Sequence, residues 1–272
     1  MAKSVVSERL SELERVLGAK LIQRTTRKLS LTENGLTFLP RAQRILREAD
    51  EAAAELAARS GRLAGPLKIS APVGFGVLHL AAALTKFLKE NRDINVTLDL
   101  DDRFVDAAAG GFDAVLRHGA IGDSRLMARR LASSRRLLVA SPDYLAREGR
   151  PESLTDLERH AAILYSMRES DWRFLKGQGW SVVRPRPALR VNNGLVMREA
   201  AEAGLGIALL PTFFVHDAIA SGSLVQIDIG EAAEGAELFI AYPRDHGASA
   251  KIRALADSLK RTFGDPPYWE RV

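Results

Sequence analysis

A run of positive side chains near the start of the chain is the first place where chemistry is expected. Lys20, Arg24, Arg27 and Lys28 lie between Lys20 and Leu31 with no acidic residue among them. Closely spaced cations suit contacts with phosphate groups, because each can neutralise one phosphate charge. A basic hairpin that faces only solvent would have the same composition, so charge alone leaves both interpretations open.

A second candidate is the stretch before these cations, which predicts an amphipathic helix that ends at Gly18. One face is apolar because large hydrophobic residues recur at helical spacing, namely Val6, Leu10, Leu13 and Leu17. The other face can approach a polar surface, because its side chains are short or charged: Lys3, Ser4, Ser7, Glu8, Ser11 and Glu12. Short apolar pairs at residues 21–22 and 29–31 then predict a hairpin with a cationic tip.

Three turns that join a strand to a following segment could bind a small ligand. Helix N-termini offer unpaired N–H groups and a partial positive charge, and open α/β sheets bind ligands at such turns. A small organic acid would suit the donors at Val73 to Gly76, the side chain of Asn193 and the charge of Arg117. For His118 a surface position is equally compatible with the sequence. The candidate ligand-binding residues are Pro72, Val73, Gly74, Phe75, Gly76, Arg117, His118, Asn192, Asn193 and Gly194.

Catalytic and metal sites find little support in the residues. The chain has no cysteine, and its five histidines are scattered without metal-ligand spacing. The acidic cluster of Asp99, Asp101 and Asp102 is best interpreted as a solvated strand end with Arg103 as its partner. Residues 74–79 begin like a dinucleotide fingerprint, but His79 stands in place of its third glycine. No nucleophile elbow is present, so we expect neither an enzyme nor a cofactor nor a metal.

The composition is that of an ordinary globular protein of two domains. Of 272 residues 46% are hydrophobic and 27% are charged, and the formal net charge is +5. Residues 1–65 hold twelve Lys and Arg against eight Asp and Glu, which leaves 27 against 26 in the remainder. The basic surplus is therefore N-terminal. No apolar run is long enough for a membrane span and no signal peptide pattern is present, so a cytoplasmic protein without membrane contact is expected.

A long helix is predicted after the hairpin, from Glu33 to about residue 60 with Thr32 as its N-cap. Pro40 lies inside it and is expected to bend it locally. One such helix cannot bury a long apolar stripe against a small hairpin, so we expect it to pair with a second copy of the chain. The stripe consists of Leu36, Leu39, Ile45, Leu46, Ala49, Ala53, Leu56 and Ala57.

After residues 65–66 short apolar strands alternate with helices, which indicates a mostly parallel sheet. Helices are expected at residues 76–90, 105–109, 194–203 and 213–220, and one long strand at 181–191. The closing segment, residues 265–272, is broken by two prolines and is expected to be an extended surface segment.

The sequence SVVSERLSELERVLGAKLIQRTTRKLSLTENG closely resembles the winged helix-turn-helix of LysR-type transcriptional regulators. The resemblance includes the recognition helix, the step at Leu13-Glu14, the following glycine, the wing arginines and the start of a linker helix. It implies a partial winged helix-turn-helix (1–31), a linker or dimerisation helix (32–65) and an α/β effector-binding domain (66–272). That domain would resemble type 2 periplasmic binding proteins, with one subdomain at 66–141 and 238–264 and the other at 142–237.

The resemblance also implies a function, namely sequence-specific regulation of transcription through double-stranded DNA. The helix that begins near Lys3 would enter the major groove, where Ser4, Ser7, Glu8 and Arg9 could reach base edges. Arg24, Arg27 and Lys28 on the wing would contact phosphates or the minor groove. A small-molecule effector would occupy the cleft between the subdomains, and the chain would form a homodimer or homotetramer through the linker helix and the effector domains.

One departure from the family leaves an alternative open. Family members have roughly two further helices before the point where this sequence starts, so we expect a reading frame that continues upstream of Met1. Otherwise the chain would have lost specific DNA binding and would act as a stand-alone small-molecule sensor or solute-binding protein. A metabolic enzyme of α/β architecture is a third interpretation, which ligand turnover would distinguish from binding.

Overall fold

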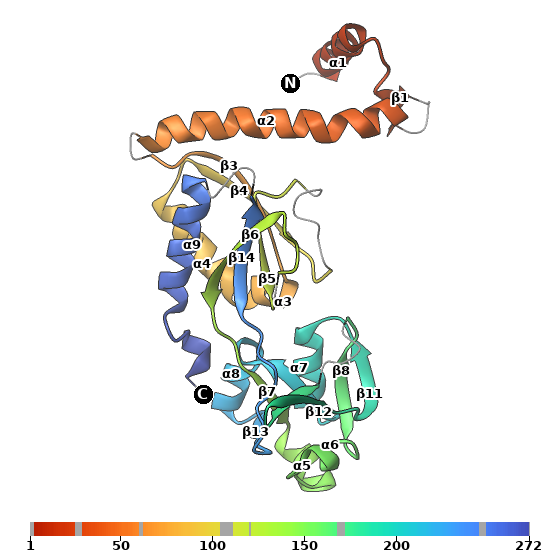
Figure 1. Ribbon diagram of the computed structural model, residues 1–272, viewed down its shortest axis with the longest axis vertical. Helices are drawn as coiled ribbons and strands as arrows, with labels where there is room; N and C mark the ends of the chain where they lie inside the picture. The colour runs from red at the N-terminus through yellow and green to blue at the C-terminus, as the bar shows by residue number, and fades with distance from the viewer. Residues whose placement is uncertain are drawn as a thin grey trace. The chain divides into compact units, whose positions relative to one another are not determined.

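The computed structural model describes residues 3–24, 29–59, 62–103, 111–119, 121–167, 172–244 and 249–271. The chain divides into two compact units, Met1–Gly61 and Arg62–Val272. Figure 1 shows the elements of both units in chain order, and each unit is described by itself.

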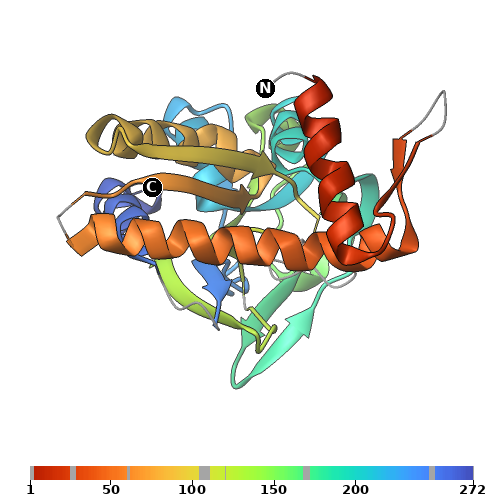
Figure 2. The ribbon, with the colours of Figure 1, turned by 90° about the horizontal axis from the view of Figure 1, so that it is seen from above.

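The first unit contains two helices and a hairpin. Helix α1 spans Lys3–Leu17 and ends at Gly18, whose φ of 64° is a left-handed conformation that glycine adopts without strain. Strands β1 (Ile22–Arg24) and β2 (Leu29–Leu31) pair antiparallel, as predicted. Figure 2 shows α1 and the hairpin gathered at the start of α2 (Glu33–Arg59), which continues past Pro40.

Two short interactions fix the chain at the start of α2. The hydroxyl of Thr32 accepts a hydrogen bond from the Gly35 amide at 3.0 Å, so the predicted N-cap is confirmed. The same hydroxyl donates to the carbonyl oxygen of Lys20 at 2.6 Å. Thr32 therefore joins the helix start to the chain just before the hairpin.

The second unit is built on two sheets, each of five strands within the described residues. The order in the first sheet is β4-β3-β5-β14-β6 and in the second β11-β8-β12-β7-β13. The bounds in the first are β3 (Gly65–Ala71), β4 (Ile94–Leu100), β5 (Ala114–His118), β6 (Leu126–Ala132) and β14 (Leu238–Pro243). Those in the second are β7 (Arg136–Ala140), β8 (Ala161–Tyr165), β11 (Arg186–Val191), β12 (Ile207–Pro211) and β13 (Val225–Ile227).

The prediction of mostly parallel sheets is corrected by the strand pairing. In the first sheet β3 is parallel to β4 and β5, but β14 is antiparallel to β5 and β6. In the second sheet β8 is parallel to β11 and β12, whereas β7 is antiparallel to β12 and β13. Each sheet is mixed because the chain changes sheet twice, after β6 and before β14, and the strands at those crossings run against their neighbours.

Helices cover both sheets and complete two lobes. The first lobe comprises the first sheet with α3 (Val73–Phe75), the π-helical turn η1 (Gly76–Leu80), α4 (Ala81–Glu90) and α9 (Ala250–Phe263). The second lobe comprises the second sheet with α5 (Pro142–Glu148), α6 (Leu154–Leu157), α7 (Gly194–Glu202), α8 (Thr212–Ser221), and the hairpin β9 (Arg173–Lys176) and β10 (Gly179–Val182). Two mixed lobes joined by two crossings confirm the two-subdomain α/β fold.

Several predicted boundaries change in the structure. The first helix of the second unit begins at Val73 rather than at residue 76, because Pro72 is extended and precedes it as N-cap. The strand predicted over residues 181–191 is divided between the end of β10 and β11, which Pro185 separates. The short helix predicted at 105–109 lies outside the described residues.

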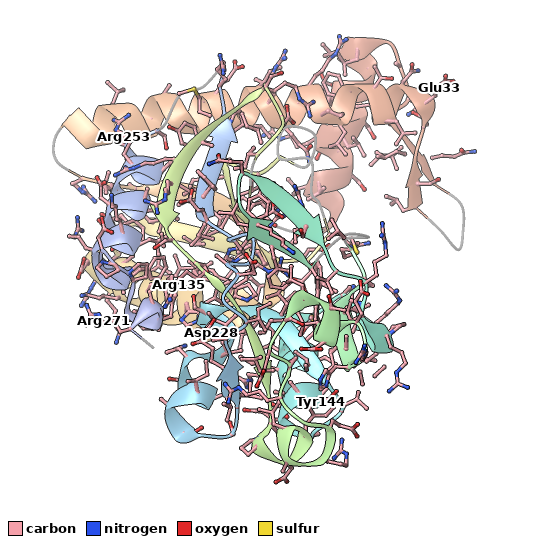
Figure 3. All side chains as sticks on the ribbon, turned by 60° about the horizontal axis from the view of Figure 1, so that its bottom comes forward. Glu33, Arg135, Tyr144, Asp228, Arg253 and Arg271 are labelled. Atoms are coloured by element: carbon pink, nitrogen blue, oxygen red, sulfur yellow. The ribbon has the colours of Figure 1, made fainter. Side chains whose placement is uncertain are left out.

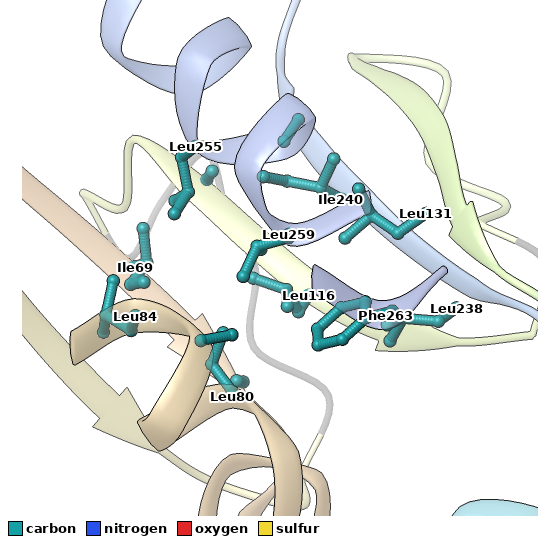
Figure 4. Packing of buried hydrophobic residues seen from close by; sticks show 14 of the residues in the cluster. Ile69, Leu80, Leu84, Leu116, Leu131, Leu238, Ile240, Leu255, Leu259 and Phe263 are labelled. Carbon is teal, nitrogen blue, oxygen red and sulfur yellow. The ribbon is translucent and has the colours of Figure 1, made fainter. Parts of the chain in front are cut away.

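The core of the first lobe lies between its sheet and the pair of helices α4 and α9. Figure 4 shows Leu80, Leu84, Leu255 and Leu259 packed over sheet residues such as Ile69. The second lobe buries hydrophobic side chains on both faces of its sheet. Each lobe therefore has its own packed core, which holds the ends of its strands in fixed positions.

The predicted extended surface tail is wrong. Residues Tyr268–Glu270 form a 3-10 turn, η2, and Trp269 is 0% exposed. The centroids of its ring and of the Phe263 ring are 5.1 Å apart, and its Nε1 donates a hydrogen bond to the carbonyl oxygen of Ser133 at 3.1 Å. Arg135, labelled in Figure 3, pairs with Glu270 at 2.6 Å. Helix α9 ends at Phe263 with Gly264 as its C-cap, and after the two prolines the side chain of Trp269 returns to the core.

Candidate functional site

A cleft of about 320 Å³ opens at the ends of strands from both lobes of the second unit. Strand ends and helix starts are the usual place for ligands in open α/β sheets. The walls include Met197, Leu209, Leu210, Pro211, Phe213 and Phe214, so the cleft is largely apolar. Its polar residues are Asp102, Arg103, Arg117, His118, Arg136 and Tyr165. The cleft thus combines apolar walls with a few polar groups, as ligand pockets commonly do.

Arg117 brings a buried positive charge to the cleft from the end of β5. Its guanidinium donates to the carbonyl oxygen of Leu116 at 2.8 Å and to Ser70 Oγ at 3.1 Å. Its buried Nε has no hydrogen-bond partner in the described part of the chain. Burial lowers the pKa of Arg117, an effect opposed by nearby carboxylates, of which that of Asp101 is the strongest. Arginine stays protonated in proteins, so this N–H can serve a ligand anion.

His118 follows Arg117 and is not at the surface. Its ring stacks on Phe213 with centroids 4.6 Å apart, and the ring of Phe75 is nearly perpendicular to it with centroids 5.4 Å apart. Neither buried ring nitrogen makes a hydrogen bond of normal geometry to a described residue. Burial lowers the pKa of His118 to about 4, so the ring is neutral at pH 7. A neutral imidazole can donate one hydrogen bond and accept another.

Arg136 is a further positive residue that lines the cleft, and the sequence did not identify it. It begins strand β7, is 8% exposed and donates to the carbonyl oxygen of Leu209 at 3.4 Å. The signal that could have identified it is an arginine directly before the apolar run Leu137-Leu138-Val139. Among the residues that line the cleft, Arg136, Arg103 and Arg117 are positive and Asp102 is negative, and Arg103 is also paired with Asp101.

Asp102 is the second residue whose role the sequence interpretation missed. Asp101 pairs with Arg103 at 2.7 Å, as expected for a strand end, but Asp102 turns toward the cleft. One oxygen of Asp102 accepts from the Val73 amide at 2.9 Å, and the other accepts from Asn193 Nδ2 at 3.0 Å. Two donors that we assigned to a ligand are thus engaged by the protein itself.

The predicted ligand-binding residues occupy different places around this cleft. Pro72, Arg117, His118 and Gly194 line it. Asn193 caps α7 by accepting from the amides of Leu195 and Val196, and Asn192 beside it is exposed.

The first turn of α3 supports the wall of the cleft. Phe75 is fully buried among aromatic rings. A Cβ at Gly74 would lie 2.4 Å from the ring of Phe214, and one at Gly76 would lie 2.4 Å from Leu100. Val73 precedes these residues, with its amide on Asp102. Close approach to other side chains, more than contact with a ligand, accounts for the glycines here.

The candidate DNA-contacting residues lie on α1 and the hairpin of the first unit. Lys3 and Ser4 begin α1, and Glu8 and Arg9 are exposed on it, with Ser7 half-buried. Arg24 ends β1. Arg27 and Lys28 lie outside the described residues.

Glu14 holds the hairpin against α1, a role that the sequence interpretation did not assign. Its side chain is 7% exposed and accepts hydrogen bonds from the amides of Leu21 and Ile22 at 2.9 and 3.2 Å. Its other oxygen pairs with Lys20 at 2.6 Å. Lys20, followed by the Leu21 amide, lowers the pKa of Glu14 to about 2. The orientation of the wing thus depends on one carboxylate of the helix.

Two classes of site find no support in the described residues. No group of three or more His, Cys, Asp or Glu side chains there could hold a metal ion. Among the described helices, none is both long and apolar enough to cross a membrane.

Comparisons with known proteins cover both units. Residues 1–36 match the family model of the bacterial regulatory helix-turn-helix protein, lysR family, and residues 60–264 match that of the LysR substrate binding domain. The transcriptional regulator CrgA of Neisseria meningitidis serogroup C is 35% identical over 269 residues, which are 97% of this chain and 89% of that protein.

Solved structures agree with these matches. The structure of CrgA from Neisseria meningitidis is 32% identical with a TM-score of 0.67, over 96% of this chain and 90% of that chain. The full-length structure of the Vibrio cholerae virulence activator AphB is 26% identical with a TM-score of 0.64, over 95% of this chain and 89% of that chain. The chain belongs to the LysR family of DNA-binding transcriptional regulators and carries the substrate binding domain of that family.

Proposed function

We propose that this regulator binds a small organic acid with an apolar body in the cleft of its second unit and binds operator DNA through its first unit. The observation that carries the ligand class is the pair Arg117 and His118 at the end of β5. The buried Nε of Arg117 makes no hydrogen bond within the described residues, and the ring of His118 makes none of normal geometry, its one polar contact being with the backbone of Ala236. Unmade buried hydrogen bonds cost roughly 1–3 kcal/mol each, so a ligand that satisfies them gains that much.

The volume of the cleft and the residues that line it restrict the class of possible ligands further. A volume of about 320 Å³ is near the lower end for small-molecule pockets, which favours one ring or a short chain. Phe213 and Phe214 offer apolar contact, whereas Arg117 and Arg136 offer charge. A carboxylate on an apolar body matches both, because a carboxylate can pair with arginine and accept from a neutral histidine.

The proposal for DNA binding rests on α1 and the hairpin. Ser4, Ser7, Glu8 and Arg9 would approach base edges in the major groove, while Arg24, Arg27 and Lys28 would contact phosphates. The match of residues 1–36 to the helix-turn-helix family model supports this over a stand-alone sensor or solute-binding protein.

Self-association would supply the second DNA-binding unit. Several large apolar side chains of α2 are exposed in the single chain, namely Leu36, Leu39, Ile45, Leu46 and Leu56. A second copy of α2 would cover them, and a dimer or tetramer would then address a two-fold symmetric DNA site. An effector that binds one arrangement of the lobes better than another would change how the DNA-binding units are presented.

The ligand class is tested by thermal shift with pairs of carboxylates and their uncharged amides, such as benzoate and benzamide. We expect stabilisation by carboxylates alone, and a loss of affinity of about ten-fold or more in Arg117→Met, because charged hydrogen bonds contribute roughly 1.5–3 kcal/mol. The matched control is Arg129→Met, which removes an arginine paired with Asp257 and absent from the lining of the cleft. Equal stabilisation by acid and amide would refute the proposal.

DNA binding is tested by gel shift on the DNA upstream of the gene at several salt concentrations. Arg9→Ala is expected to weaken specific binding by roughly 1–3 kcal/mol if it contacts a base. Arg44→Ala on α2 is the control, because Arg44 pairs with Glu48 of its own helix. Unchanged affinity and unchanged sequence preference in Arg9→Ala would remove α1 from the DNA interface.

A further inference from the structure

Asp102 joins the two lobes of the second unit at the edge of the cleft. It follows β4 of the first lobe, and its two oxygens accept from Val73 N in that lobe and from Asn193 Nδ2 in the other. Asn193 is the N-cap of α7, so its side chain is held at the same time by the amides of Leu195 and Val196. One carboxylate therefore connects the first turns of α3 and α7.

The space between these two helix starts is already filled. The ring of Phe214 lies between them, because a Cβ added at Gly74 would be 2.4 Å from it and one added at Gly194 would be 2.3 Å from it. A negative charge is favoured at helix N-termini, where backbone N–H groups are unpaired. Asp102 provides that charge from within the chain.

We propose that Asp102 is an internal anion that holds the lobes together in the place where an anionic effector would otherwise bind, and that such an effector competes with it. This inference rests on the proposed organic-acid effector for its second part only. The Val73 amide has one proton and already donates to Asp102, so a second carboxylate gains this donor only if Asp102 leaves. Two carboxylates side by side would also repel each other.

The charges around Asp102 are consistent with competition between its carboxylate and that of an effector. Arg117 interacts with Asp101, Asp102 and Asp99, and Arg103 is already paired with Asp101. An effector carboxylate that reaches Arg117 therefore shares this cation with Asp101 and Asp102, of which Asp102 also holds the Val73 amide. The free protein would be held by Asp102 until a ligand with enough additional contact, such as apolar packing on Phe213, displaces it.

Asp102→Asn is the decisive variant because it keeps the size of the side chain. Both partners of Asp102 are donors, and an asparagine has one accepting oxygen, so its NH₂ group would face one of the two donors. Rotation of Asn193 would not repair this, because its oxygen already caps α7. The matched control is Asp101→Asn, which removes the charge of the neighbouring, outward ion pair with Arg103.

The first measurement is amide hydrogen exchange in the full chain without ligand. In Asp102→Asn we expect faster exchange at Val73 and in the capped first turn of α7, at Leu195 and Val196, and no such change in Asp101→Asn. The α7 amides belong to the other lobe, so their response reports the bridge rather than a local loss at residue 102. Equal exchange at α7 in both variants would overturn the proposal.

The second measurement is the affinity for benzoate by calorimetry in the same three proteins. Competition predicts an affinity about ten-fold or more higher in Asp102→Asn than in Asp101→Asn, corresponding to about 1.4 kcal/mol, because both variants remove one negative charge near Arg117 but only Asp102→Asn frees the Val73 amide. Weaker binding in Asp102→Asn would show that Asp102 contacts the ligand, and it would overturn the competition. If carboxylates bind none of the three proteins, the organic-acid effector and the competition with it both fail, while the exchange result still decides whether Asp102 bridges the lobes.

Discussion

The two units differ in where they keep their large apolar side chains. In the first unit Leu46 is 66% exposed and Val6 is 53% exposed, and α2 has further leucines on its surface. In the second unit Trp172, Trp269 and Phe75 are at most 2% exposed. The first unit thus needs another surface to complete its core, whereas the second contains its own. This distribution of hydrophobic residues is the basis for proposing assembly through the first unit and ligand binding in the second.

The largest effect that would test this contrast is expected in the core of the second unit. Trp269→Ala removes a buried ring and the hydrogen bond to Ser133, so the free energy of unfolding of this unit should fall by about 3–5 kcal/mol. Urea unfolding followed by circular dichroism measures it. The control Trp180→Ala changes a side chain that is 47% exposed. A similar small loss in both variants would mean that the tail does not belong to the core.

A smaller effect, confined to association, is expected from Leu46→Glu on α2. If a second copy covers Leu46, the variant loses roughly 1.5–3 kcal/mol of apolar burial in each chain. Analytical ultracentrifugation should show dissociation at concentrations where the wild type associates, with the unfolding of the second unit unchanged. The control is Gln43→Glu, an exposed polar position on the same helix. If both variants dissociate, the added negative charge, and not the loss of apolar contact at Leu46, would be the cause of dissociation.

The third effect expected is a dependence of stability on pH that arises from buried histidines of the second unit. Burial lowers the pKa of His118 to about 4, below its ordinary value of 6.5. The unfolded chain therefore binds the proton first, and the contribution of neutral His118 is complete above pH 6.5 and is lost as pH falls toward 4. His79, whose pKa burial also lowers to about 4, acts in the same direction.

The measurement for His118 is the melting temperature of the wild type and of His118→Phe between pH 7.5 and 4.5. We expect a smaller decline in the variant, since phenylalanine keeps the stacking on Phe213 and cannot be protonated. His160→Phe, which alters a half-buried histidine beside Tyr144 in the second lobe, is the control. Parallel curves for wild type and His118→Phe would exclude His118 as the source.

Local patterns predicted the elements of the first unit well. The spacing of Leu10, Leu13 and Leu17 predicted α1, Gly18 its end and Thr32 the start of α2, and each is present in the structure. These features depend on neighbours within a few residues, for which helical periodicity and capping chemistry suffice. The role of Glu14 was not predicted, because its partners lie seven and eight residues away, beyond the end of its helix.

The cleft was predicted only in outline. Arg117 and His118 were placed at a strand end and line the cleft, but the surface alternative for His118 was decided only by the rings of Phe213 and Phe75. The assignment of Val73 and Asn193 as ligand donors overlooked Asp102, which is 29 residues from one and 91 from the other. A local sequence pattern does not show which distant acceptor will be hydrogen-bonded to a given donor in the folded chain.

The sequence by itself determined the family of this regulator, the helix and hairpin of its first unit, and the alternation of strands and helices in its second. These follow from motif, periodicity and turn chemistry, which act over short stretches of chain. Only the tertiary structure decided that the sheets are mixed, that Trp269 returns to the core and that Asp102 joins Val73 to Asn193. The physical reason is that these depend on which strands pair and which side chains meet across the fold, and such long-range contacts are set by packing of the whole unit.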